Sequence, residues 1–292
     1  MELSHHFSTL KNSLKNSHTQ PWQTKTNIPM FLASIALIEL IMFIIIPPVA
    51  RSLLFIGDGD SSLGDVVGAI GTKTADGIYY KHQRGNSSSR TIVINFHGNY
   101  QIISSRNSVF DKMKSDVYAI YEVEYRGYGG VPGNPDEISL SDDLKNFVKW
   151  VEREHPKQQI ILEGYSVGAT LVLLNLHSLG SQINGAVVFS PFSSLTDIVK
   201  SLWFTKIFFV RDCGWNVLEE IRKGTKVPVL IFGAEDDKTV PIELTRHISE
   251  EMKERNNLNK FYEFENGGHF LPFSRSHRYQ ISKYIRSFLS NI

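Results

Sequence analysis

Residues 164–168, Gly-Tyr-Ser-Val-Gly, constrain the fold more than any other part of this chain. An apolar run at residues 159–162 precedes them and a second apolar run follows directly, which predicts a buried strand that turns sharply into a buried helix. Gly164 and Gly168 flank the turn because side chains there would collide where strand and helix cross. The turn would present the hydroxyl of Ser166 at a helix N-terminus, where backbone N–H groups stabilise negative charge. We therefore predict that Ser166 is a nucleophile; the alternative is a serine that caps the helix after an ordinary turn.

A nucleophilic serine needs a general base, and the base needs a carboxylate to orient it. A buried strand predicted at residues 227–233 leads into an acidic loop, and a further strand ends shortly before His269. Loops at strand ends are where α/β sheets place their chemistry. We predict that His269 is the base and Asp237 its partner. Asp236 and Glu235 are close competitors for the acid, and an ordinary solvated acidic loop is the alternative interpretation.

The oxyanion of an acyl-transfer intermediate needs preorganised hydrogen-bond donors. A buried strand predicted at residues 91–96 ends in His-Gly-Asn. The glycine lets the backbone approach a ligand closely, so we expect the N–H of Asn99 to act together with that of Val167. His97 is a second candidate for the base. Its place before Ser166 and beside the glycine turn favours a structural role, in which it braces this loop.

Together these residues resemble the α/β-hydrolase superfamily over roughly residues 72–292. Four motifs restrict the resemblance to one subgroup of this superfamily; they lie at residues 96–99, 125–129, 190–195 and 227–230. This set is similar to the membrane-anchored, small-lid subgroup of α/β-hydrolase domain-containing proteins, which includes esterase-like and protein-depalmitoylating members. The resemblance favours Asp237 as the acid, because D-x-x-V-P spacing relates it to Pro241. The bulky Tyr100 and Phe232 depart from the family pattern and would alter the shape of the substrate site, but they remove no catalytic group.

Alternating strand and helix patterns predict a mostly parallel sheet with helices on both faces. Ser139 and Asp142 suggest a capping box at the start of one helix. Residues 87–89, three serines, are expected at the tip of a hairpin. Core strands are predicted at residues 117–121 and 185–189, and amphipathic helices at residues 242–252 and 279–289.

Composition agrees with one large globular domain. The 292 residues are 41% hydrophobic, enough to bury a substantial core. A net charge of +1 gives no electrostatic reason to expect nucleic acid as a partner. The single cysteine, Cys213, excludes an intramolecular disulfide and is expected to be a packing residue. No Cys/His cluster has metal-ligand spacing and no phosphate-binding glycine loop occurs, so we expect neither a metal nor another cofactor.

The N-terminal region differs from the rest of the chain. Residues 28–46 are apolar apart from a few positions such as Glu39, and as a helix they would reach about 28 Å, close to the thickness of a hydrocarbon core. A charged Glu39 would oppose membrane insertion by about 2–3 kcal/mol, whereas the Leu, Ile and Phe residues favour it by about 6 kcal/mol. The net free energy of insertion should therefore be favourable. We predict a polar tail at residues 1–27, a transmembrane anchor at 28–46, a linker and the start of the domain at 47–71, and the hydrolase domain at 72–292.

A cleaved signal peptide is the alternative to the anchor. Its polar leader would be unusually long, its apolar run exceeds the usual ~7–15 residues, and residues 48–50 form a poor cleavage site. Three lysines precede the span, whereas one arginine and three aspartates follow it. This bias favours a cytoplasmic N-terminus with the catalytic domain on the opposite side of the membrane.

The region between residues 191 and 228 is too short for a large cap domain and predicts a small lid. Its apolar residues could line an acyl-chain groove, pack on the core or touch the bilayer; they are Leu202, Trp203, Phe204, Ile207, Phe208, Phe209, Val210 and Trp215. The sequence therefore predicts a membrane-anchored serine hydrolase that cleaves an ester or thioester with an apolar acyl group. The alternatives are a peptidase or amidase with the same triad, and a non-catalytic scaffold with a hydrolase fold.

Overall fold

The computed structural model describes residues 28–55, 72–99, 101–102, 108–202, 205, 208–255 and 259–292. The chain divides into two compact units, Met1–Met42 and Phe43–Ile292. The predicted polar tail, residues 1–27, and residues 56–71 of the predicted linker lie outside the described residues.

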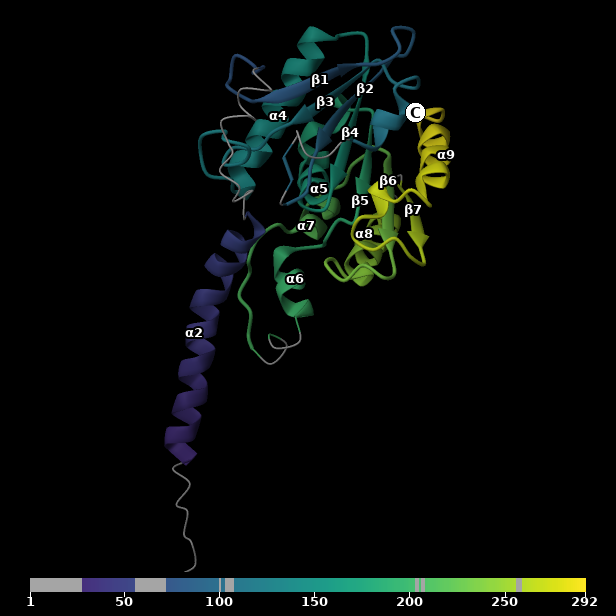
Figure 1. Ribbon diagram of the computed structural model, residues 1–292. Helices are drawn as coiled ribbons and strands as arrows, with labels where there is room; N and C mark the ends of the chain where they lie inside the picture. Colours follow the sequence, from purple (N-terminus) through teal and green to yellow (C-terminus); the bar gives the residue numbers. More distant parts are fainter. Residues whose placement is uncertain are drawn as a thin grey trace, which may run out of the picture. The chain divides into compact units, whose positions relative to one another are not determined.

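A seven-stranded sheet forms the centre of the second unit, in the order β1-β3-β2-β4-β5-β6-β7 (Figure 1). Strand β1 is antiparallel to β3, and the remaining neighbours are parallel. The inner strands are apolar runs, as expected for a parallel sheet that is covered on both faces. The strands are β1 Tyr80–Arg84, β2 Thr91–Phe96, β3 Ala119–Val123, β4 Gln159–Tyr165, β5 Gly185–Phe189, β6 Val229–Ala234 and β7 Asn259–Phe264. The predicted mostly parallel sheet is confirmed.

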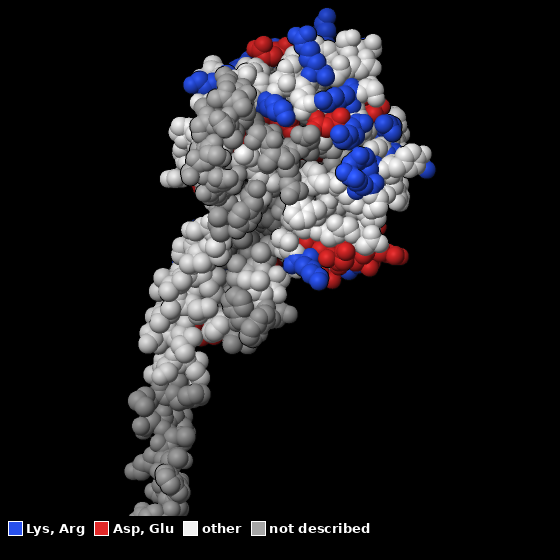
Figure 2. Space-filling view, viewed as in Figure 1, with Lys and Arg blue, Asp and Glu red and all other residues white. Residues whose placement is uncertain are grey.

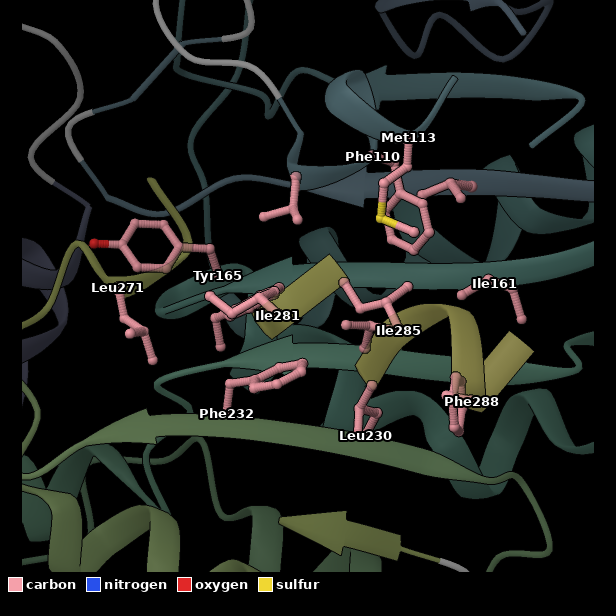
Figure 3. Close-up of a cluster of buried hydrophobic side chains, with 14 of the residues drawn as sticks. Phe110, Met113, Ile161, Tyr165, Leu230, Phe232, Leu271, Ile281, Ile285 and Phe288 are labelled. Carbon is pink, nitrogen blue, oxygen red and sulfur yellow. The ribbon is translucent and has the colours of Figure 1, made fainter. Parts of the chain in front are cut away.

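Helices cover both faces of the sheet. Helix α5 (Val167–Leu179) packs against β2, β4 and β5, and it also contacts the helices α4 (Glu137–Glu154) and α7 (Val217–Arg222). Helix α9 (Arg278–Leu289) covers a separate apolar cluster, in which Figure 3 shows its side chains beside those of the 3₁₀ helix η1 (Val109–Met113) and of the inner strands. The remaining elements are α6 (Leu195–Ser201), α8 (Ile242–Glu254), η2 (Gly180–Gln182) and η4 (Leu271–Phe273).

Two local predictions about strands differ from the structure. Residues 87–89 are not the tip of a hairpin, since β3 lies between β1 and β2 in the sheet. Strand β3 begins later than residue 117. The carbonyl oxygens of Val117 and Tyr118 instead accept hydrogen bonds from the backbone N–H groups of Asn86 and Gly85.

The predicted capping box at the start of α4 was displaced by one helical turn. The N-cap is Asp136, whose carboxylate accepts hydrogen bonds from the N–H groups of Ile138 and Ser139. Ser139 is therefore the third residue of the helix and closes the box onto the Asp136 backbone. The backbone N–H groups of the first helical turn have no acceptor within the helix, and the Asp136 carboxylate accepts their hydrogen bonds in place of the Ser139 hydroxyl.

Helix α2 runs from Ile28 to Leu54 and includes the predicted span. It continues past residue 46 through Pro47 and Pro48, which the sequence interpretation had placed in a linker. Residues Leu32–Leu54 are long and apolar enough to cross a membrane. Only 11% of the most apolar 18-residue stretch within them is buried by the rest of the protein. Most of the helix therefore has no protein core to cover it, which makes it a candidate membrane span.

Candidate active site

The structure brings the three predicted catalytic side chains together at the carboxyl ends of the parallel strands. Ser166 follows β4, Asp237 follows β6, and His269 lies in the loop after β7. His269 Nε2 is 3.0 Å from Ser166 Oγ, and His269 Nδ1 is 2.8 Å from Asp237 Oδ2. This geometry suits a base that withdraws the serine proton while the carboxylate fixes the orientation of the ring.

Ser166 has the strained backbone that the pentapeptide predicts. Its φ is 55°, in the left-handed region that a residue with a side chain seldom adopts. A Cβ atom on Gly168 would lie 2.0 Å from the carbonyl oxygen of Phe96, and one on Gly164 would lie 2.5 Å from the carbonyl oxygen of Gly168. The two glycines are therefore required by the close crossing of strand and helix, as predicted.

Asp237 is buried and fully engaged. One carboxylate oxygen faces His269, and the other accepts hydrogen bonds from the N–H groups of Thr239 and Val240 at 2.8 and 2.9 Å. Burial opposes the negative charge, but the hydrogen bonds and the attraction of the imidazole outweigh it and lower the pKa of Asp237. An ionised Asp237 accepts a hydrogen bond from Nδ1–H of His269, which leaves the Nε2 lone pair able to accept a proton from Ser166.

Asp236 contacts a different part of the same loop. Its carboxylate accepts hydrogen bonds from the N–H groups of Gly268 at 2.7 Å and of Gly267 at 3.4 Å. It thus holds the backbone next to His269. The sequence interpretation treated Asp236 only as a competing acid; the pair of glycines before the histidine was the feature that could have indicated this role.

The predicted oxyanion residues flank the serine. Val167 is the first residue of α5, where backbone N–H groups have no acceptor within the helix. Asn99 lies after β2, next to Gly98, where a Cβ atom would meet the ring of Tyr165 at 2.8 Å. The N–H of Gly98 donates to Gln101 Oε1 at 2.8 Å, which curves the loop toward the site.

His97 braces this loop, as predicted, and does not take part in the Ser166 contact. Its Nδ1 is 2.8 Å from a neighbouring backbone carbonyl oxygen, and its Nε2 is 2.8 Å from Glu124 Oε1. Tyr125 donates its hydroxyl to the His97 carbonyl oxygen at 2.7 Å, and Tyr128 donates to Asn99 Oδ1 at 2.9 Å. The motif at residues 125–129 therefore supports the loop after β2 that carries Asn99, a role that its sequence did not specify.

A cavity of about 320 Å³ opens above Ser166 and His269. Its apolar wall consists of Leu54, Phe192, Ile198, Val240 and Phe270, and its polar lining includes Asn99, Gln101 and Thr239. The contribution of Leu54 was not predicted, since it comes from the last turn of α2. Of the apolar lid residues, Trp203, Phe204 and Ile207 lie outside the described residues, whereas Trp215 is buried.

A larger cavity of about 810 Å³ lies beside residues that directly precede β5 and β6. It is therefore at the amino ends of these strands, whereas Ser166 lies at the carboxyl ends. Among the residues that the structure describes, no group of three or more His, Cys, Asp and Glu side chains could hold a metal ion.

Known proteins share this architecture. Residues 87–212 match the family model Hydrolase_4, described as serine aminopeptidase, S33. Lysophosphatidylserine lipase ABHD12 of Danio rerio is 24% identical over 220 residues, covering 68% of this chain and 56% of the relative. Protein bem46 of Schizosaccharomyces pombe is 27% identical over 170 residues, covering 56% of each chain. The chain spans a little over half the length of these curated relatives.

Solved structures show the same fold at low sequence identity. The Pyrococcus furiosus esterase Pf2001 has a TM-score of 0.58 and 20% identity, covering 74% of this chain and 87% of the esterase. The Pyrococcus horikoshii acylaminoacyl peptidase has a TM-score of 0.58 and 16% identity, covering 73% of this chain and 39% of the peptidase. The solved structures show that the chain has the α/β-hydrolase fold. In sequence, the chain is similar to the ABHD12 and bem46 proteins and, over residues 87–212, to the serine aminopeptidase family model.

Proposed function

We propose that this chain is a membrane-anchored serine hydrolase that cleaves a carboxylic ester or thioester carrying an apolar acyl chain. The observation that carries the proposal is the pair of contacts Ser166–His269 and His269–Asp237 at the base of an apolar cavity. The name of the ABHD12 relatives, lysophosphatidylserine lipases, supports an acyl ester of a lipid as the substrate.

In the proposed reaction Ser166 Oγ attacks the substrate carbonyl carbon while His269 Nε2 takes the hydroxyl proton. The carbonyl oxygen becomes an oxyanion, which the N–H groups of Asn99 and Val167 stabilise. The intermediate collapses, the bond to the alcohol or thiol breaks, and His269 returns its proton to that leaving group. Water then attacks the acyl-enzyme with His269 again as base, which releases the carboxylic acid and restores Ser166.

The apolar wall of the cavity would hold the acyl chain. Phe192, Val240 and Phe270 lie on the same cavity as Ser166, so an alkyl chain bound there would leave water. A second candidate is a peptidase or amidase that uses the same residues, which the description of the matching family model favours. The apolar lining and the lipase relatives favour the ester or thioester.

The proposed anchor is residues 28–46, which overlap the candidate membrane span Leu32–Leu54 of helix α2. The excess of lysines before the span supports a cytoplasmic N-terminus with the catalytic domain on the opposite side. Protease applied to intact cells or sealed vesicles tests this orientation, since a domain on the far side of the membrane from the cytoplasm is cut only from that side.

A fluorophosphonate probe tests the nucleophile. The full chain in detergent should be labelled, and Ser166→Ala should abolish the label. Ser166→Ala and His269→Ala should each lower turnover by about 10³-fold or more, and the double variant should be little worse, because the two residues act as a unit. Labelling that persists in Ser166→Ala, or losses that add in the double variant, would refute the triad.

Matched esters, thioesters and anilides of increasing acyl length would then rank the substrate classes. We expect kcat/KM for esters or thioesters to rise with chain length until the cavity is filled. A preference for anilides or peptides would favour the second candidate. No turnover of any of these, with no labelling, would identify a scaffold.

A further inference from the structure

The short segment that follows α6 exposes an aromatic ring. Phe209 is 71% exposed, and Leu202 at the end of α6 is 45% exposed. An aromatic side chain with this exposure loses the free energy that burial would provide. We call residues 208–211 the Phe209 segment.

The Phe209 segment lies against the apolar helix α2. The ring of Phe209 stacks on that of Phe43, with centroids 5.9 Å apart and planes 18° apart. The Arg211 guanidinium lies 5.3 Å from the centroid of the same Phe43 ring. Further along the helix, Arg51 Nε donates to the carbonyl oxygen of Cys213 at 3.0 Å. Residues 209–213, which include most of the Phe209 segment, therefore follow α2 from Phe43 to Arg51.

The position of Phe43 sets the depth of this contact. Phe43 lies three residues before Ile46, where the predicted span ends, so it would lie roughly 4.5 Å inside the hydrocarbon boundary. Phe209, stacked on it, would lie at a similar depth, close to the lower end of the ~5–10 Å typical of elements inserted at a membrane surface. Arg51, five residues beyond Ile46, would lie about 7.5 Å outside the boundary, among the lipid headgroups. Arg211 can extend its cation toward the same layer.

Charge on α2 agrees with this placement. Glu39 and Arg51 are the two charged residues in its sequence, and the described surface of the helix is almost wholly uncharged in Figure 2. By contrast, Figure 2 shows Lys and Arg side chains gathered on the surface near α9. An apolar surface that continues from a candidate membrane span onto an exposed phenylalanine fits lipid acyl chains as its partner.

We propose that the Phe209 segment is a second membrane contact, in which Phe209 inserts among lipid acyl chains beside Phe43. The contact would fix the domain so that its active-site cavity faces the bilayer. Leu54 of α2 and Ile198 of α6 line that cavity, and they belong to the two elements between which the Phe209 segment lies. An acyl chain could then pass from the membrane to Ser166 without crossing water. This last consequence rests on the proposed function; the membrane contact itself does not.

Depth measurements test the contact directly. The full chain with Phe209→Cys, carrying a nitroxide spin label, would be reconstituted in phosphatidylcholine vesicles. Tyr279→Cys on α9 is the matched control, because Tyr279 is an aromatic residue with 80% exposure. The wild-type chain, whose one cysteine is the buried Cys213, sets the labelling background. We expect oxygen to broaden the signal at position 209 and a water-soluble nickel chelate to broaden that at position 279. Equal access of the nickel chelate to both positions would overturn the proposal.

Activity provides a second measurement. Phe209→Asp should lower hydrolysis of an ester embedded in vesicles by about ten-fold, because an inserted phenylalanine is replaced by a charge. Hydrolysis of a short, water-soluble ester should stay unchanged, and Tyr279→Asp should alter neither rate. An equal loss on both substrates, or no loss on vesicles, would overturn the membrane contact. Should the wild-type chain hydrolyse neither ester, the proposed function fails, and the spin-label result still decides the contact.

Discussion

Glu163 is a buried acid next to the active site whose protonation should control stability. It lies on β4, three residues before Ser166, and is 2% exposed. Its carboxyl group accepts a hydrogen bond from the N–H of Val109 at 2.9 Å and contacts the hydroxyl of Ser108. Burial raises its pKa from 4.5 to about 7, although these hydrogen bonds act in the opposite direction. The folded protein therefore favours the neutral acid.

Replacement by the neutral isostere should stabilise the protein at neutral and alkaline pH. Below pH 4.5 the acid is protonated in both folded and unfolded chains, so Glu163 and a glutamine behave alike. As the pH rises from 4.5 to about 7, the wild type loses stability, because the unfolded chain ionises freely and the buried site resists ionisation. Each difference of one in pKa corresponds to about 1.4 kcal/mol, so Glu163→Gln should gain about 3 kcal/mol by pH 8.

Urea unfolding of the full chain in detergent, from pH 4 to 8.5, would measure the difference between wild type and Glu163→Gln. The glutamine can still accept from Val109, and the Ser108 hydroxyl can rotate to accept from the new amide. Glu152→Gln, on the exposed side of α4, controls for the loss of one surface charge. A stability difference that does not grow between pH 4.5 and 7, or a glutamine variant less stable at pH 8, would refute the reasoning.

Four further outcomes follow from the site and the anchor. Asp237→Asn should lower kcat far more than Asp236→Asn, because the first contacts the imidazole and the second contacts loop backbone; steady-state kinetics showing the reverse order would exchange their roles. Gly168→Ala should prevent folding, since its Cβ would lie 2.0 Å from a β2 carbonyl oxygen, and a variant with unchanged melting temperature would contradict this. His97→Ala should lower kcat by about 10–100-fold with little change in KM, because it loosens the oxyanion loop; a change confined to KM would argue against that role. The chain should remain in the membrane pellet after carbonate extraction, and its release would show that Leu32–Leu54 is not a span.

The sequence was sufficient where a local pattern alone dictates structure. The apolar runs of a parallel sheet read directly as strands, and β2 and β5 have the predicted bounds. The sharp turn at Ser166 is determined by its flanking glycines, because few other residues tolerate a strand and a helix that cross so closely. The positions of Ser166, Asp237 and His269 at strand ends followed from the same apolar runs.

Tertiary structure decided what depends on partners distant in the sequence. Adjacent carboxylates at Asp236 and Asp237 have the same local chemistry, and only the packing of the β7 loop turns one toward a backbone and the other toward His269. Strand β3 lies between β1 and β2 in the sheet, and the residues that connect β1 to β2 in the sequence give no indication of this order. Leu54 lines the cavity beside Ser166 because α2 continues beyond residue 46, where the predicted span ends. Backbone geometry is fixed by neighbouring residues, and so the sequence predicts it, whereas the surroundings of a side chain depend on contacts that form only once the whole chain has folded.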